Sequence, residues 1–277
     1  MERRRFLAFA LTSVIGRLTR AEESIESFRS LLRFRSEPGA FRNASAHVQG
    51  ICCDDEALYV VFENYVYKLD WTGSVLRSTA APSHSGDACL ANGRLYVSMS
   101  TSDGSALYEY DRDLQLLRKL KLERCPGCDG VEYFDGRFYI GGPSTVEPHL
   151  KNLVLVYDAE FNLVDEGEVD FGTPTVYGPQ AITSAQGRLL FAFYPTEDAA
   201  SNALRAAWTD KALSTLGASS FDAANGWAVA PKRFQRSTLS TRLIVARTET
   251  LDGETALTLR AVDFDGRNLV ELDDSSE

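Results

Sequence analysis

Histidine, methionine and long apolar runs are scarce in this chain of 277 residues, which has three histidines and two methionines. No apolar run reaches the roughly 20 residues that a membrane-spanning helix needs, so the sequence predicts no transmembrane segment. Positive charge is also in deficit, because 29 Lys and Arg stand against 39 Asp and Glu, for a net charge of −10. Phosphate backbones repel an acidic chain, so nucleic acid is not expected as a partner.

Several motifs of enzymatic chemistry are missing as well. The chain has no Gly-rich phosphate loop, no G-x-S-x-G nucleophile elbow and no H-E-x-x-H zinc helix. Helical periodicity is almost absent, whereas turn signals recur roughly every 8 to 12 residues. The chain is nevertheless 44% hydrophobic, which is enough to bury a sizeable core. These features predict a large domain built from short strands.

The five cysteines are an odd number, so they cannot all pair within the chain. Cys125 and Cys128 have the C-x-x-C spacing of redox sites. A thioredoxin-type site needs this spacing at the start of a helix, where the helix lowers the pKa of the thiol. Here the motif leads into a strand, so a local disulfide or a pair of buried thiols is the favoured interpretation. Zinc is disfavoured because no second C-x-x-C exists.

The first 21 residues (1–21) have the form of an export signal. A basic start precedes an apolar run of about ten residues from Phe6, and small residues follow it. Arg3 and Arg4, with Phe6 and Leu7, resemble the R-R-x-F-L pattern of twin-arginine signals in bacteria. We therefore predict a signal peptide and a periplasmic or secreted location. The alternative is a basic amphipathic helix that lies on the domain.

A short repeat organises the rest of the chain. A turn followed by an apolar strand recurs as DEALYV, NGRLYV, DGRFYI and QGRLLF, with a weaker copy in TRLIVA. An alternating strand, a turn and a further strand follow each copy, as in VYKLDWTGSVL. The units begin roughly 37 to 51 residues apart, close to the length of one four-stranded propeller blade.

This repeat predicts an all-β fold, a β-propeller of five four-stranded blades. Residues 22–46 form a leader segment, and the propeller spans residues 47–277. The regular period argues against the alternative, a β-sandwich. The expected blades are residues 47–83, 84–124, 125–173, 174–224 and 225–277.

Alignment of the blades places polar residues at equivalent positions of the first strand of each blade, which lines the central channel. Two histidines stand eight residues before the turn residue of their blades, and three other polar side chains stand six before it. Side chains alternate along a strand, so both positions share a face and point to one axis. Two acids follow in the same window. The expected ring comprises His47, Gln49, His84, Asp87, Asp129, Glu132 and Gln180.

The third histidine, His149, lies in the connection between the second and third strands of the third expected blade. That connection emerges on the face where the innermost strands begin, and so does a long insertion in the fourth blade. Loops on a rigid scaffold often carry function, so we expect this face to be the functional one. Further side chains expected near it are Tyr177, Tyr194, Asn225 and Trp227.

Two functions remain open. In the first, the protein is an enzyme, a hydrolase or lyase that acts on a carbohydrate or related small polar substrate. Its catalytic residues would be His47, His84, Asp87 and Glu132, with the two histidines as acid–base groups or as ligands of a divalent metal ion. Its ligand-binding residues would be Gln49, Asp129, His149, Tyr177, Gln180, Asn225 and Trp227. In the second, a non-catalytic propeller binds a ligand or a protein partner, and its channel is polar for structural reasons.

The segments HVQGICCDD, HSGDACLANGRLYV, CDGVEYFDGRFYI and YGPQAI resemble uncharacterised bacterial propeller proteins, which are often exported. These are distantly like the NHL and SMP-30 (gluconolactonase-like) propellers. The resemblance covers about residues 47–270 and implies the propeller fold. SMP-30-like enzymes hold a divalent metal in the channel through Glu, Asn and Asp. This chain has His, Gln and Asp there, so the resemblance does not imply their lactonase activity.

Overall fold

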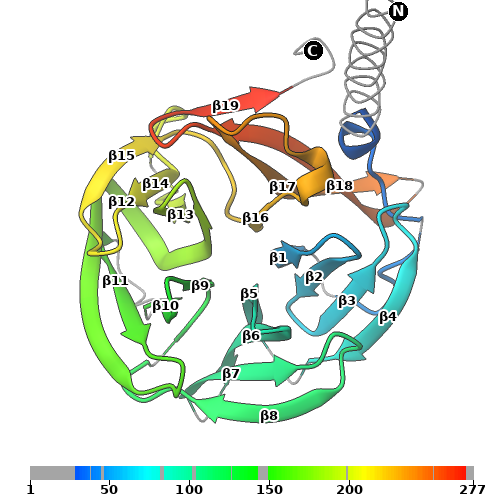
Figure 1. Ribbon diagram of the computed structural model, residues 1–277, viewed down its shortest axis with the longest axis horizontal. Coiled ribbons are helices and arrows are strands. Elements are labelled where there is room, and N and C mark those ends of the chain that lie inside the picture. The colour runs from blue at the N-terminus through cyan, green and yellow to red at the C-terminus, as the bar shows by residue number, and fades with distance from the viewer. Residues whose placement is uncertain are drawn as a thin grey trace, which may run out of the picture.

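The computed structural model forms a ring of five four-stranded blades around a central axis, a β-propeller (Figure 1). Two neighbouring blades are joined in one seven-stranded sheet. The fold expected from the repeat is therefore confirmed. No helix in the described part of the chain is long and apolar enough to cross a membrane. The export signal expected over residues 1–21 lies outside the described residues and stays a prediction. The structure describes residues 29–37, 39–44, 47–81, 84–101, 104–125, 127–142, 149–197, 199–251 and 253–272.

Each blade has four antiparallel strands, and the innermost strand runs along the axis. Blade 1 contains β1 (Val48–Cys53), β2 (Leu58–Phe62), β3 (Tyr65–Leu69) and β4 (Val75–Ala80). Blade 2 contains β5 (Ser85–Ala91), β6 (Arg94–Thr101), β7 (Gly104–Tyr110) and β8 (Leu116–Lys121). Blade 3 begins with β9 (Val131–Phe134), β10 (Arg137–Gly141) and β11 (His149–Tyr157). Blade 4 ends with β13 (Arg188–Pro195), β14 (Ala206–Thr209) and β15 (Thr215–Ser219). Blade 5 contains β16 (Trp227–Val229), a 3-10 turn (Lys232–Phe234), β17 (Thr241–Leu251), β18 (Glu254–Phe264) and β19 (Leu269–Leu272).

Blades 3 and 4 share one long strand, β12 (Leu163–Ala185). Its first half pairs with β11 as the outermost strand of blade 3, and its second half pairs with β13 as the innermost strand of blade 4. The register shifts between Val176 and Pro179, where Tyr177 and Gly178 have φ values of 64° and 68°. This local break lets one strand pass from the rim of the ring to its axis.

The core is divided into five apolar clusters, one at each junction between neighbouring blades. Between blades 1 and 2, for example, Tyr59 and Val61 of β2 pack with Leu95 and Val97 of β6. A strand with both faces buried in this way has a continuous apolar sequence, as β2 does with LYVVF. The blades therefore hold one another, and no blade has a complete core of its own.

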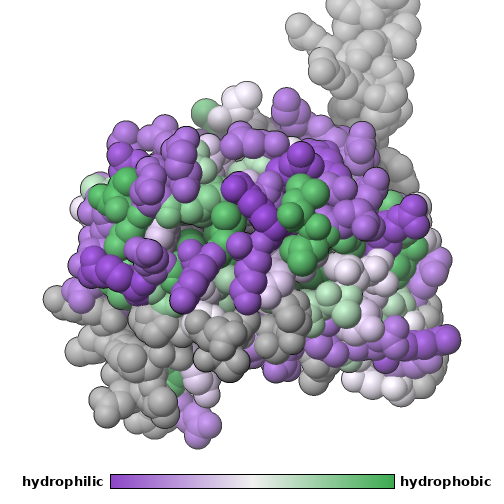
Figure 2. Space-filling view, turned by 90° about the horizontal axis from the view of Figure 1, so that it is seen from below, coloured by the Kyte–Doolittle hydropathy of each residue, from purple (hydrophilic) through white to green (hydrophobic). Residues whose placement is uncertain are grey.

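The outermost strands are exposed to solvent along the rim. The side of the ring seen in Figure 2 is largely hydrophilic, with separate apolar patches between the polar side chains. Every blade has at least one exposed apolar side chain on its outer strand, and these are Leu76, Leu116, Leu117, Val164, Leu216 and Val270. Edge strands with such side chains can pair with other chains, and the interspersed charges oppose that pairing.

The described part of the leader segment packs across the junction of blades 1 and 5. Phe41 is buried in the apolar cluster at this junction. The amide of Ser36 donates to the carbonyl of Leu257 in blade 5 at 3.0 Å, and the amide of Glu37 donates to the carbonyl of Gly73 in blade 1 at 3.2 Å. The segment thus ties the first blade to the last, a role that its polar, irregular sequence did not predict.

Neighbouring innermost strands approach one another at backbone distance. A Cβ atom on Gly50 would lie 2.4 Å from Cα of Asp87 in blade 2. A Cβ atom on Gly226 in blade 5 would lie 2.7 Å from Cα of Gly50 in blade 1, where the ring closes. Only glycine leaves room for such an approach.

We expect Gly50→Ala to lower the free energy of unfolding by about 2 to 3 kcal/mol, because the new methyl group must displace the backbone of β5. Gly136→Ala is the matched control. Gly136 has a φ of 80° and no neighbour within 4 Å, so it carries only the conformational cost of about 1 kcal/mol. Urea unfolding followed by circular dichroism measures both. Equal losses in the two variants would show that the approach at Gly50 is not tight.

Candidate functional site

A cavity of about 710 Å³ opens at the end of the channel where the innermost strands begin. Residues from blades 1 to 4 surround it. It is lined by His47, Gln49, His84, Ser100, Gly127, Asp129, Val176, Tyr177, Gln180 and Tyr194. We call this space the mouth cavity. The structure thus brings seven of the side chains that the sequence singled out into one place.

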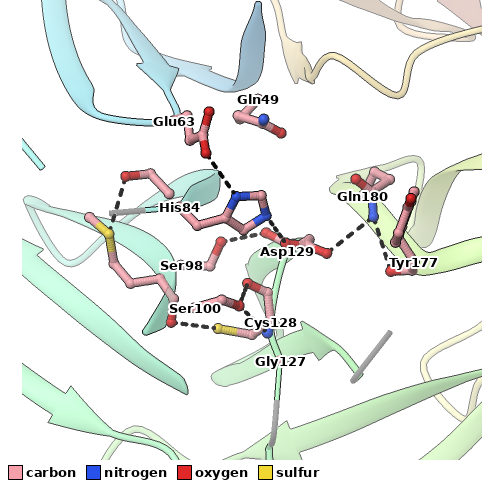
Figure 3. A network of polar contacts seen from close by, with 12 residues as sticks. Gln49, Glu63, His84, Ser98, Ser100, Gly127, Cys128, Asp129, Tyr177 and Gln180 are labelled. Atoms are coloured by element: carbon pink, nitrogen blue, oxygen red, sulfur yellow. Dashed lines mark hydrogen bonds and ion pairs between the residues drawn. The ribbon is translucent and has the colours of Figure 1, made fainter. Parts of the chain in front are cut away.

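His84 stands between two carboxylates in the mouth cavity (Figure 3). Its Nδ1 atom lies 3.4 Å from Oε1 of Glu63, and its Nε2 atom lies 3.8 Å from Oδ1 of Asp129. The side chain is half exposed, so the ring borders the open space of the cavity. A carboxylate beside an imidazole orients the ring and selects which ring nitrogen carries the hydrogen.

Asp129 is the most buried ionisable group of the mouth cavity, with a side chain 15% exposed. Burial raises its pKa, while the neighbouring His84 and a hydrogen bond from Gln180 act in the opposite direction. The Gln180 amide donates to Oδ2 of Asp129 at 3.2 Å and to the carbonyl of Tyr177 at 3.0 Å (Figure 3). This amide therefore ties the carboxylate of blade 3 to the backbone of blade 4.

Two further pairs complete the polar wall. The Gln49 amide nitrogen lies 3.1 Å from Nε2 of His47. The Tyr194 hydroxyl donates to Oδ1 of Asn225 at 2.9 Å, which adds blade 5 to the site. Burial raises the pKa of Tyr194 to about 12, so its hydroxyl remains a hydrogen-bond donor at neutral pH.

Two lining residues have backbone conformations that L-amino acids seldom adopt. His84 has a φ of 31° and Tyr177 a φ of 64°. Residues held in such conformations often lie at ligand sites, where the surrounding structure must overcome the strain. Tyr177 is also 53% exposed, so its ring is free to cover a ligand.

Asp87 is not part of the mouth cavity, contrary to the expectation that it acts beside the histidines. Its side chain is fully buried at the waist of the channel. Its Oδ2 atom accepts hydrogen bonds from the amides of Ile182 at 2.8 Å and Val131 at 3.4 Å. Burial raises the pKa of Asp87 well above its usual range. Asp87 therefore satisfies backbone groups of blades 3 and 4 and is closed off from ligands.

Glu132 and Trp227 lie in a second cavity of about 240 Å³, lined also by Cys52 and Cys89. These residues follow the mouth-cavity residues along the chain of their blades, so they lie deeper along the axis. The physical reason is the rise of about 3.3 Å per residue along a strand, which puts Glu132 about 10 Å deeper than Asp129. The expectation that Glu132 and Trp227 share a site with the histidines is therefore corrected.

His149 begins β11 and pairs with Thr175 through the backbone, and its expected ligand-binding role stays a prediction. Among the described residues, no three His, Cys, Asp or Glu side chains form a group that could hold a metal ion. The ring nitrogens of His84 face two carboxylates instead, and Nε2 of His47 faces Gln49. A divalent metal held by His47 and His84 stays a prediction, and no step proposed below depends on it.

Three residues of the site were not expected from the sequence. Glu63 lies in the turn between β2 and β3, which no alignment of the innermost strands covers. Ser98 and Ser100 lie on β6, and Ser98 donates to the carbonyl of Asp129. The sequence feature that could have indicated Ser98 and Ser100 is their placement in β6, where the second strand of the other blades has apolar residues.

Comparisons with known proteins support the fold. No protein-family model matches this chain, and no curated protein matches it in sequence. The structure is similar to glutaminyl cyclase from Myxococcus xanthus, with a TM-score of 0.57, 16% identity and coverage of 86% of this chain and 95% of that chain. It is also similar to a thermostable family-43 glycoside hydrolase, with a TM-score of 0.53, 10% identity and coverage of 83% and 94%. At such identities the likeness shows a shared propeller architecture.

The second cavity yields a prediction about pH. Burial raises the pKa of Glu132 from 4.5 to about 8, and a hydrogen bond from Ser184 opposes the shift. Between pH 4.5 and about 8, Glu132 is therefore protonated in the folded state and ionised in the unfolded state. The free energy of unfolding falls as pH rises through this range, by up to about 1.4 kcal/mol per pH unit. We expect Glu132→Gln to remove this loss. Urea midpoints at several pH values measure it, with the exposed Glu56→Gln as control. A slope unchanged in Glu132→Gln would contradict the assignment.

Proposed function

We propose that the mouth cavity binds a small polar ligand rich in hydroxyl groups, of the carbohydrate class, and that His84 acts on this ligand as a general acid–base. The observation that carries the proposal is the convergence of polar side chains from separate blades on one cavity. His47 and Gln49 come from blade 1, His84 from blade 2, Asp129 from blade 3 and Gln180 from blade 4.

The size and chemistry of the mouth cavity fit such a ligand. Its volume of about 710 Å³ lies within the range of small-molecule pockets. Amide, imidazole and hydroxyl groups offer both donors and acceptors, as hydroxyl-rich ligands require. Tyr177 and Tyr194 add aromatic surface at the edge, which packs well against a ring with an apolar face.

The acid–base role follows from the surroundings of His84. Its ring lies between Glu63 and Asp129, so the imidazolium formed on protonation has carboxylate partners. In a hydrolysis, the Nε2 atom of the neutral imidazole can take a proton from a water molecule as that water attacks the bound ligand. The imidazolium then gives this proton to the leaving-group oxygen as the bond to it breaks. Glu63 orients the ring through Nδ1, and Gln180 holds Asp129 in place beside Nε2.

The binding test is a screen by thermal shift and calorimetry. The probes are monosaccharides, disaccharides and aldonolactones, together with a peptide that begins with glutamine, chosen because one similar structure is a glutaminyl cyclase. We expect a hydroxyl-rich probe to bind. Gln180→Ala removes two hydrogen bonds in the wall, so we expect affinity for that probe to fall roughly 10- to 100-fold. Gln115→Ala on the rim is the matched control and leaves affinity unchanged.

The catalytic test uses His84→Gln with the best-binding probe of the screen. Loss of the acid–base group is expected to lower kcat about 10²- to 10⁴-fold, with KM changed only a few-fold. Chromatographic product analysis measures the rate. Binding without turnover in the wild type would reject the acid–base role and leave the alternative, a non-catalytic binding propeller. Absence of binding by every probe in the screen would reject the ligand class.

A further inference from the structure

Cys125 and Cys128 lie in the connection between β8 and β9, directly before the innermost strand of blade 3. Both are free thiols in the structure and both are buried, with 3% and 0% of their surfaces exposed. They pack in the apolar cluster between blades 2 and 3. The described residues of the connection, 122–125 and 127–130, include no helix, so the motif differs from thioredoxin-type sites, in line with the prediction from the sequence.

The two thiols pack in the same apolar cluster, near enough for each to shift the pKa of the other. The Cys125 thiol donates to the carbonyl of Gly127 at 3.0 Å, so its sulfur faces the second half of the motif. The amide of Cys128 donates to Oγ of Ser100 at 3.1 Å, which fixes the second cysteine against β6. Two sulfurs held together on a short loop need little movement to form a bond.

This loop is part of the wall of the mouth cavity. Gly127 lines the cavity, Ser100 lines it from blade 2, and Asp129 follows Cys128 directly in the chain. Figure 3 shows Cys128 and Ser100 beneath His84 and Asp129. A covalent link between the cysteines would therefore stiffen the segment that presents Asp129.

We propose that Cys125 and Cys128 form a reversible disulfide, a redox site in the wall of the mouth cavity. With a low-molecular-weight disulfide such as oxidised glutathione, the Cys125 thiolate attacks one sulfur and expels one glutathione thiolate. The Cys128 thiolate then attacks the Cys125 sulfur of the mixed disulfide and expels the second glutathione thiolate. The two cysteine thiols are oxidised, one glutathione disulfide is reduced to two thiols, and the two protons lost by the cysteines go to the leaving thiolates.

The surroundings of the thiols support this order of steps. The interaction between the thiols lowers the pKa of Cys125 and raises that of Cys128, so Cys125 is the better attacking group. Burial raises the pKa of Cys52 and Cys89 in the second cavity, so these thiols are less reactive. The oxidation is therefore selective for one pair out of five cysteines.

The test equilibrates the folded protein in glutathione buffers of increasing oxidising strength. The samples are quenched with acid, unfolded and alkylated without reductant, and their intact mass is measured. We expect the oxidised protein to lose two hydrogens and to take up three alkyl groups, whereas the reduced protein takes up five. Peptide mapping is expected to place the bond between Cys125 and Cys128. Five alkyl groups at every glutathione ratio, or a bond between other cysteines, would overturn the proposal.

Variants sharpen the result. Cys125→Ser and Cys128→Ser are each expected to take up four alkyl groups, or three with one bound glutathione, and to lose no hydrogens. Cys53→Ser is the matched control and is expected to keep the bond, taking up two alkyl groups when oxidised. Loss of the bond in Cys53→Ser would also contradict the proposal. The wild-type peptide map stands by itself if a serine variant does not fold.

Discussion

The close approach of the innermost strands around the axis is the constraint on which the rest of the structure depends. Gly50, Gly130 and Gly226 leave out the Cβ atoms that would collide with the next blade. The backbones then bond directly, since the amide of Asp87 donates to the carbonyl of Asp129 at 2.7 Å. This contact closes the channel at a waist and separates the mouth cavity from the second cavity. On each innermost strand, residues that precede this contact in the chain line the mouth cavity, and residues that follow it line the second cavity.

Asp87 shows how a polar channel residue can be structural. Its carboxylate accepts amide hydrogens from two neighbouring blades, and its other oxygen has no hydrogen-bond partner in the described part of the chain. Such an environment favours the neutral acid, in line with the raised pKa. The half-exposed His84 and the partly exposed Asp129 differ from it, because they border open space. Access to the cavity, more than polarity, therefore separates the candidate functional residues from the structural ones.

The sequence could predict the blades and part of the site, because both follow from periodicity. His47 and His84 share a repeat position, so they share a mouth of the channel. Glu132 was grouped with the histidines by its polarity, although it comes three residues after Asp129 and the rise along the strand carries it to the second cavity. Glu63 comes from a turn of the neighbouring blade, and contacts between elements at different repeat positions have no signature in a single sequence. The passage of β12 through two blades depends on its local break at Tyr177, which a pattern of alternating residues does not reveal.

The same contacts that close the waist also determine which part of the site can move. Ser98 and the amide of Asp87 both donate to the carbonyl of Asp129, and Gln180 holds its carboxylate. Asp129 is therefore fixed on three sides. His84 precedes β5 and its side chain is half exposed, so its ring is less enclosed than the carboxylate of Asp129. The present 3.8 Å between His84 and Asp129 exceeds hydrogen-bond length. Any shortening of this distance when a ligand binds must then come from His84, because the blades hold Asp129 still.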